Sequence, residues 1–208
     1  MKKTFLIFCA LSAFLLFGCA GSSAQNRYYT LASESSVKAS NGTPYRLVVK
    51  KFSVDPAYSQ PNIVYRESPY EFMSYGNDFW ASSPEHQVAN TVASLMRESG
   101  LFAQVERRAS EIPDLELSGH LNAIEEIDSD SSETFARVAV ELTLQNGKTG
   151  KTLWKRAYDE KKKLGNRTPL ELAKAASALV THYAEDSIRE IEEILAKNPQ
   201  EESESENP

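Results

Sequence analysis

The clearest pattern in the chain is an alternation of apolar and polar residues between positions 115 and 161. It runs through residues 115–123 and again through residues 136–144. Successive side chains of a strand point to opposite faces, so each segment is predicted to be a strand with one buried face. A glycine-containing turn at residues 146–150 leads to a third segment, 153–161. The three segments are predicted to form an antiparallel meander with one wet face.

A first helix is predicted after residue 81. Ser82 or Ser83 can cap it, and Pro84 suits its first turn. Glu85 follows Ser82 by three residues, as in a capping box, and Gly100 is placed to end the helix. The predicted buried stripe consists of Val88, Val92, Leu95 and Met96.

A second, longer helix is predicted near the end of the chain. Thr168 caps it, Pro169 starts it, and Glu171 completes a second capping box. Apolar residues then recur at helical spacing through about seven turns. This stripe consists of Leu172, Ala176, Leu179, Val180, Tyr183, Ile188, Ile191 and Leu195.

Shorter segments rich in aromatic and β-branched residues are predicted to be further strands. They are residues 27–31, 45–54, 62–66, 70–74 and 101–105, and a break is expected at residues 75–78. The fold class that results is α+β, a mostly antiparallel sheet with two helices packed on one face.

The amino-terminal pattern differs from the rest of the chain. Lys2 and Lys3 precede an apolar run, residues 5–17, that is too short to span a membrane and is typical of a secretory signal peptide. The run ends in Leu16-Phe17-Gly18-Cys19, which resembles the bacterial lipobox. The resemblance implies an S-diacylglycerol group and an N-acyl chain such as palmitate on Cys19. A plain secreted protein with a cysteine near the cut by chance is the alternative.

The signal peptide sets the expected domain boundaries. Residues 1–18 would be removed, and residues 19–44 would form a lipidated tether with a first short strand. Residues 45–197 would form one domain, and the acidic tail, 198–208, is predicted to be disordered. Ala20, rather than Asp, follows the lipobox cysteine, and by resemblance to lipoprotein sorting rules this favours the periplasmic face of the outer membrane.

Charge and cysteine content narrow the functional classes. The chain has 23 basic and 29 acidic residues, and removal of Lys2 and Lys3 leaves a formal balance of -8. A general grip on nucleic acid is therefore not expected. Cys9 would leave with the signal peptide and Cys19 would carry lipid, so the mature domain would have no free thiol and no disulfide.

No catalytic or metal-binding motif is evident. His86, His120 and His182 fall on different predicted elements without the spacing of metal ligands, and no Gly-x-Ser-x-Gly motif frames a serine nucleophile. The carboxylates of residues 125–130 are predicted to be solvated at a hairpin tip. Lys161, Lys162 and Lys163, joined by Arg167, could contact lipid headgroups, but a solvated strand end is favoured. The protein is therefore predicted not to be an enzyme and to need no metal or cofactor.

The aromatic residues around the first predicted helix are candidates for a contact with a partner or a lipid. They are Trp80, Phe79, Tyr75 and Tyr70. Aromatic surface is what a docking site requires. For Trp80 the favoured alternative is a wedge in the core between the sheet and the helix.

Three segments together resemble the ABC-type transport auxiliary lipoprotein family, represented by the paraquat-inducible outer-membrane lipoprotein. They are the lipobox followed by the strand at 27–31, the tyrosine-rich strands that lead to Phe79-Trp80-Ala81-Ser82, and the meander followed by a long terminal helix. The resemblance implies a non-enzymatic, lipid-anchored accessory of a cell-envelope lipid transport system. A mammalian-cell-entry-domain (MCE) periplasmic protein would be its partner, and homo-oligomers are possible.

Two other functions stay open on the sequence alone. The protein could be an assembly cofactor of another envelope machine, such as lipopolysaccharide insertion or cell-wall synthesis. A lipid-modified hydrolase would need an acid, a base or a nucleophile that the sequence does not reveal.

Overall fold

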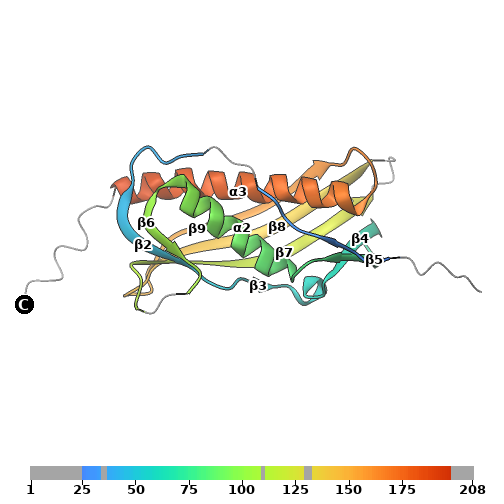
Figure 1. Cartoon of the computed structure of the whole chain (residues 1–208), viewed down its shortest axis with the longest axis horizontal. Helices are drawn as coiled ribbons and strands as arrows, with labels where there is room; N and C mark the ends of the chain where they lie inside the picture. Colours follow the sequence, from blue (N-terminus) through green and yellow to red (C-terminus); the bar gives the residue numbers. More distant parts are fainter. Residues whose placement is uncertain (1–24, 34–36, 109–110, 129–132, 198–208) are drawn as a thin grey trace, which may run out of the picture.

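The computed structural model describes residues 25–33, 37–108, 111–128 and 133–197. In these residues the chain forms one curled mixed sheet with two long helices on one face (Figure 1). The strands are β1 (Arg27–Tyr29), β2 (Thr43–Val49), β3 (Ser53–Val54), β4 (Asn62–Ser68), β5 (Glu71–Trp80), β6 (Phe102–Glu106), β7 (Leu115–Asp128), β8 (Thr134–Asn146) and β9 (Thr152–Lys163). The helices are η1 (Pro56–Tyr58), α2 (Pro84–Ser99) and α3 (Pro169–Lys197).

The predicted meander is confirmed and is longer than expected. β7 pairs antiparallel with β8 along its whole length, and β8 pairs antiparallel with β9. Alternate residues of β8, and of β7 as far as Leu121, enter the core, as the alternation predicted, whereas β9 buries only Trp154 and Tyr158. β7 is therefore the long central strand on which the rest of the sheet is built.

The prediction of a mostly antiparallel sheet is wrong. The edge of β7 opposite β8 pairs with β2, β3 and β4 in turn, and all three are parallel to β7. β6 is parallel to β2, and β1 is parallel to β5, so five of the eight pairings between described strands are parallel. Apolar alternation reports which face of a strand is buried and carries no information on strand direction.

The predicted break at residues 75–78 is also wrong. β4 and β5 correspond to the strands predicted at residues 62–66 and 70–74 and form a hairpin, but β5 continues without interruption to Trp80. Its second half is held on both sides, because Asn62 of β4 pairs with Phe79 and β1 pairs with residues 78–80. Long-range pairing thus overrides the local tendency of Gly76 and Asn77 to form a turn.

The helix boundaries agree with the sequence signals, but neither predicted capping box is complete. Gly100 has a φ of 74° and caps the carboxyl end of α2, and Thr168 Oγ1 accepts a hydrogen bond from the Glu171 N–H at the start of α3. At α3, however, the Thr168 N–H donates to the Asn166 carbonyl oxygen, and the Glu171 side chain pairs with Lys174.

At the start of α2 the N-cap residue is Ser83. Its hydroxyl donates to Glu85 Oε1 and not to the backbone, so the capping box predicted there does not form.

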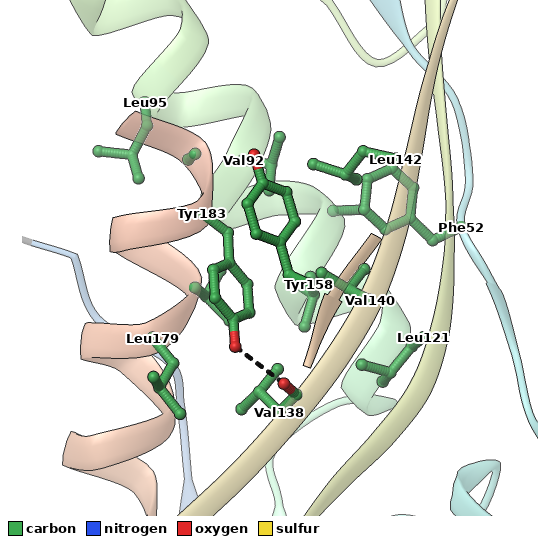
Figure 2. Close-up of a cluster of buried hydrophobic side chains, with 14 of the residues drawn as sticks. Phe52, Val92, Leu95, Leu121, Val138, Val140, Leu142, Tyr158, Leu179 and Tyr183 are labelled. Carbon is green, nitrogen blue, oxygen red and sulfur yellow. Dashed lines mark hydrogen bonds between the residues drawn. The ribbon is translucent and has the colours of Figure 1, made fainter. Parts of the chain in front are cut away.

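The core lies between the two helices and the covered face of the sheet (Figure 2). The Tyr183 ring of α3 stacks on the Tyr158 ring of β9, with centroids 4.5 Å apart. The Tyr183 hydroxyl donates to the Val138 carbonyl oxygen at 2.9 Å, the bond drawn in Figure 2, and accepts from the Glu160 N–H. Burial raises the pKa of the Tyr183 hydroxyl. A buried phenol with its hydrogen bonds satisfied thus fastens α3 to the meander.

One glycine of β7 is required by packing. A Cβ atom on Gly119 would lie 2.6 Å from Cε2 of Phe52, whose side chain is only 1% exposed. Phe52 fills the space beside β7 that a side chain at position 119 would occupy. Gly119 therefore allows the loop between β2 and β3 to pack against the middle of the sheet.

Gly119→Ala is expected to destabilise the protein by about 1–3 kcal/mol, because Phe52 must move out of a filled core. Urea unfolding of the purified protein measures the change. Gly76→Ala is the matched control: Gly76 also lies in a strand, and its added Cβ would meet nothing within 4 Å. Equal losses of unfolding free energy in the two variants would contradict the packing argument.

Candidate functional site

Two consecutive carboxylates are buried near the end of β7. Glu125 and Glu126 are both 0% exposed. The prediction that they are solvated at a hairpin tip is wrong, because β7 continues to Asp128 and is paired there on both sides, with β4 and β8. Asp130, from the same prediction, lies outside the described residues. A buried carboxylate needs charged partners, and the structure supplies three arginines.

Glu125 is held by three donors. The Tyr58 hydroxyl donates to its Oε2 at 2.7 Å, Arg66 Nε donates to the same oxygen at 2.6 Å, and Arg137 Nη1 donates to Oε1 at 2.9 Å. Arg137 also forms a two-pronged contact with Asp159 of β9, at 2.7 and 2.8 Å. Its hydrogen bond with Arg137 lowers the pKa of Asp159, and burial raises the pKa of Tyr58 to about 12. Glu125 thereby ties η1 and β4 to the meander.

Glu126 is held from the opposite side of β7. The Tyr75 hydroxyl lies 3.0 Å from both of its carboxylate oxygens, and Arg167 Nε donates to Oε1 at 3.1 Å. Burial raises the pKa of Glu126, while Tyr75 and Arg167 act to lower it. Burial also raises the pKa of Tyr75 to about 12.

Arg167 joins three parts of the chain and is not part of a free basic patch. Besides Glu126, its guanidinium donates to Asp128 of β7 and to Glu67 of β4, each at 2.8 Å. The three lysines with which it was grouped, residues 161–163, are exposed on β9, and Lys163 pairs with Glu133. The carboxylates of β4 and β7 therefore share one cation from the loop before α3.

The same arginines support aromatic rings of the β4–β5 hairpin. The Arg66 guanidinium lies 4.8 Å from the centroid of the Phe72 ring, and Arg167 lies 5.5 Å from that of Tyr65. The Tyr58 ring meets Phe72 edge-on at 5.5 Å, and Tyr65 packs on Tyr75 at 4.9 Å. The hairpin is thus fixed on a network of charges and rings, and we call this end of the molecule the aromatic end.

The four predicted aromatic candidates do not form one surface. Trp80 is 2% exposed and lies in the core, as the alternative interpretation proposed, so it cannot contact a partner. Tyr75 is half-buried on Glu126, and half-buried Phe79 stacks on Tyr28 with centroids 5.7 Å apart. Tyr70, between β4 and β5, is 96% exposed. The period of two along β5 separates Trp80 from its neighbour Phe79.

Two exposed aromatic residues were missed as site candidates. Phe72 is 39% exposed near the hairpin turn, and Tyr28 is 64% exposed on β1. The Ser68-Pro69 turn signal was available for Phe72, since residues beside a turn are commonly exposed. Cys19, the predicted lipid attachment, lies outside the described residues.

The opposite end of β7 is basic and hollow. An open groove of about 760 Å³ is lined there by Val48, Lys50, Lys51, Arg107, Arg108, Glu111, Ile112, Pro113, Glu116 and Gly147. Arg107 Nη1 donates to the carbonyl oxygens of Val49 and Lys50, and burial lowers the pKa of this arginine. Ile112 is 71% exposed at its rim.

The histidines lie apart from one another. His120 shares a hydrogen bond with the Ser53 hydroxyl, His182 lies 3.8 Å from Glu160, and His86 is exposed on α2. In the part of the chain that the structure describes, no group of three or more histidine, cysteine or acidic residues is arranged to hold a metal ion. Within the same residues, neither helix is long and apolar enough to cross a membrane.

The model of the ABC-type transport auxiliary lipoprotein component family matches residues 29–186, from β1 into the second half of α3. The chain belongs to this family. The match includes the whole aromatic end and both carboxylates of β7. Members of the family are auxiliary lipoproteins of ABC-type transport systems, so the resemblance seen in the sequence is confirmed.

Solved structures share the fold. A Xanthomonas campestris protein of the DUF330 family superposes with a TM-score of 0.75 at 17% identity, covering 84% of this chain and 99% of its own. A crystal structure of an uncharacterized protein gives a TM-score of 0.66 at 18% identity, with 81% and 99% covered. The hypothetical protein CT253 of Chlamydia trachomatis gives 0.51 at 6% identity, with 75% and 100% covered. No curated protein matches the chain.

Glu125→Gln is expected to lower the free energy of unfolding by about 3 kcal/mol, since removing one partner leaves buried charges uncompensated. Arg66 and Arg137, with side chains 27% and 30% exposed, would keep part of their hydration, which limits the loss. Urea unfolding measures it. Glu141→Gln is the control: Glu141 forms a surface pair with Lys155 at 3.0 Å, and its loss should stay below about 1 kcal/mol.

Arg167→Gln is expected to raise the pKa of Glu126 further, because it removes a cation that stabilises the charged carboxylate. A carboxyl group with a raised pKa in the folded state contributes stability that is full below its unfolded pKa, near 4.5, and is lost as the pH rises through the folded pKa. The free energy of unfolding should therefore fall more steeply in the variant as the pH rises above 4.5.

Carbon NMR of the Glu126 carboxyl group, with urea unfolding at several pH values, tests this prediction. Arg156→Gln is the control, since Arg156 is half-exposed and pairs with Glu190 at 3.6 Å, away from Glu126. An unchanged Glu126 pKa in Arg167→Gln would show that Arg167 does not set the charge of this site.

Proposed function

We propose that the protein is a non-enzymatic, lipid-anchored accessory of an envelope lipid transport system of the ABC and MCE type. It docks on the complex, or forms its end, at the outer membrane. The observation that carries this proposal is the family match over residues 29–186, which includes most of the described fold. An MCE periplasmic protein is its proposed partner, and the lipid on Cys19 is its proposed anchor.

The geometry of the buried carboxylates supports docking over chemistry. All four carboxylate oxygens of Glu125 and Glu126 accept hydrogen bonds from tyrosines or arginines. Those donors hold the hairpin in place and leave neither carboxylate open to a substrate. Glu125 and Glu126 therefore serve as structural hydrogen-bond acceptors. The hairpin that they hold in place presents aromatic side chains to solvent.

Cys19→Ala is expected to remove the protein from the membrane fraction, because the Cys19 thiol is the proposed site of the diacylglycerol group. Without that group at most one acyl chain could remain, and a single chain anchors a protein only marginally. Cell fractionation with an epitope-tagged full chain measures this, and mass spectrometry of the wild-type amino terminus should show the diacylglycerol. Cys9→Ala is the matched control and should leave the location unchanged. A wild-type amino terminus without lipid would overturn the proposed anchor.

Partner capture tests the docking role. Cross-linking of the natively anchored protein in cells should recover a subunit of an ABC or MCE transport system, and deletion should increase envelope permeability. Recovery of lipopolysaccharide-insertion or cell-wall machinery, with unchanged permeability, would instead support the assembly-cofactor alternative.

A further inference from the structure

The direction of β1 leads the chain back toward the hairpin turn. β1 is parallel to β5, with Arg27 opposite Asp78 and Tyr28 opposite Phe79. β5 runs from the turn at Tyr70 to Trp80, so from Tyr29 back to Arg27 the chain heads toward that turn. The anchor is therefore attached to a strand whose start faces the aromatic end (Figure 1).

The length of the tether matches this distance. Cys19 lies eight positions before Arg27, a span of at most about 28 Å. Tyr70 also lies eight positions before Asp78, the partner of Arg27, and at strand spacing these eight steps extend about 27 Å. The tether is thus long enough for the lipidated cysteine and the exposed turn to reach the same membrane surface.

We propose that the turn of the β4–β5 hairpin, with Tyr70 and Phe72, contacts the lipid surface that holds the acyl chains of Cys19. This inference rests on the anchor proposed above and adds the orientation of the domain on the membrane. The hairpin end faces the lipid, and the basic groove at the other end of β7 faces away from it.

The exposed side chains have the chemistry of a membrane interface. Tyrosine combines an apolar ring with a hydroxyl group and is enriched at the level of lipid headgroups. Tyr70 is 96% exposed, and Phe72, which is 39% exposed, is held from below by the Tyr58 ring and the Arg66 guanidinium. The Phe72 ring is therefore presented on a fixed support and needs little ordering on contact.

Charge near the turn specifies the kind of lipid surface. Glu67 and Glu71 flank the turn on both sides, and both are exposed. Glu67 shares the Arg167 guanidinium with Glu126 and Asp128, so this arginine is already paired and does not favour anionic headgroups. The contact therefore depends on partial insertion of rings. It should form on zwitterionic phosphatidylcholine and change little with salt.

Two positions at opposite ends of the molecule allow a matched test. β4 is parallel to β7 and passes Glu126, so the hairpin turn lies beyond the Asp128 end of β7. Ile112, 71% exposed, precedes the Leu115 end of the same strand, whose 14 residues extend roughly 46 Å. Trp80 and Trp154, at 2% and 6% exposure, give a buried fluorescence background.

The experiment uses the full, lipidated protein in phosphatidylcholine vesicles, with and without bromine on the acyl chains. Tyr70→Trp should show a blue-shifted emission in vesicles and a loss of intensity with brominated lipid, relative to wild type. Ile112→Trp should show neither change. Addition of salt should leave the Tyr70→Trp quenching unchanged, and addition of phosphatidylglycerol should not increase it.

Flotation of the same samples separates the two proposals. A protein that does not float with vesicles lacks the anchor, which would overturn both. A protein that floats, with Tyr70→Trp unquenched or Ile112→Trp quenched equally, keeps the anchor and overturns the orientation. Quenching that appears only with phosphatidylglycerol would also contradict the inference, because it would indicate recognition of anionic headgroups.

Discussion

The structure of the aromatic end depends on two buried carboxylates that are adjacent in β7. Because neighbouring residues of a strand point to opposite faces, Glu125 and Glu126 gather their partners from both sides of the sheet. Glu125 takes Tyr58, Arg66 and Arg137, and Glu126 takes Tyr75 and Arg167. A buried charge without its partners is strongly unfavourable. Displacement of β4 by one residue along β7 would therefore separate several charges from their partners at once, so the network also specifies the register.

This network explains why the hairpin can be both exposed and rigid. The arginines that neutralise the carboxylates also lie over Phe72 and Tyr65, so electrostatic and aromatic contacts share the same groups. Near its turn the hairpin needs little apolar core, because its inner face there contacts the charged network, while Ile63, Val64 and Trp80 further from the turn lie in the core. The outer face of the hairpin can therefore expose large aromatic rings while its backbone stays in place.

Local signals in the sequence predicted the elements well and their assembly less well. Alternation identified the meander, and the residues Gly100 and Thr168 marked helix ends, because these signals act over a few residues. The parallel pairing of β2, β3 and β4 along β7 depends on contacts between distant segments, which no local pattern encodes. The prediction that Glu125 and Glu126 are solvated is wrong for the same reason, because their partners lie between 12 and 67 residues away in the sequence. The aromatic candidates followed local signals. Tyr70 follows the Ser68-Pro69 turn and is exposed, and Trp80, beside the start of a helix, is buried as the core interpretation proposed.

Arg167 has a consequence for the order in which the molecule assembles. It closes a contact with Glu67 across 100 residues of sequence, and it stands just before the last helix. A chain that emerges from its amino terminus completes the hairpin long before this arginine becomes accessible. Until then Glu126 lacks its cation, and the rings of the hairpin lack part of their support. The contacts of the aromatic end are therefore completed late, when the carboxyl-terminal third of the chain docks. In an incomplete chain the hairpin would lack these contacts and would be accessible to proteases and chaperones.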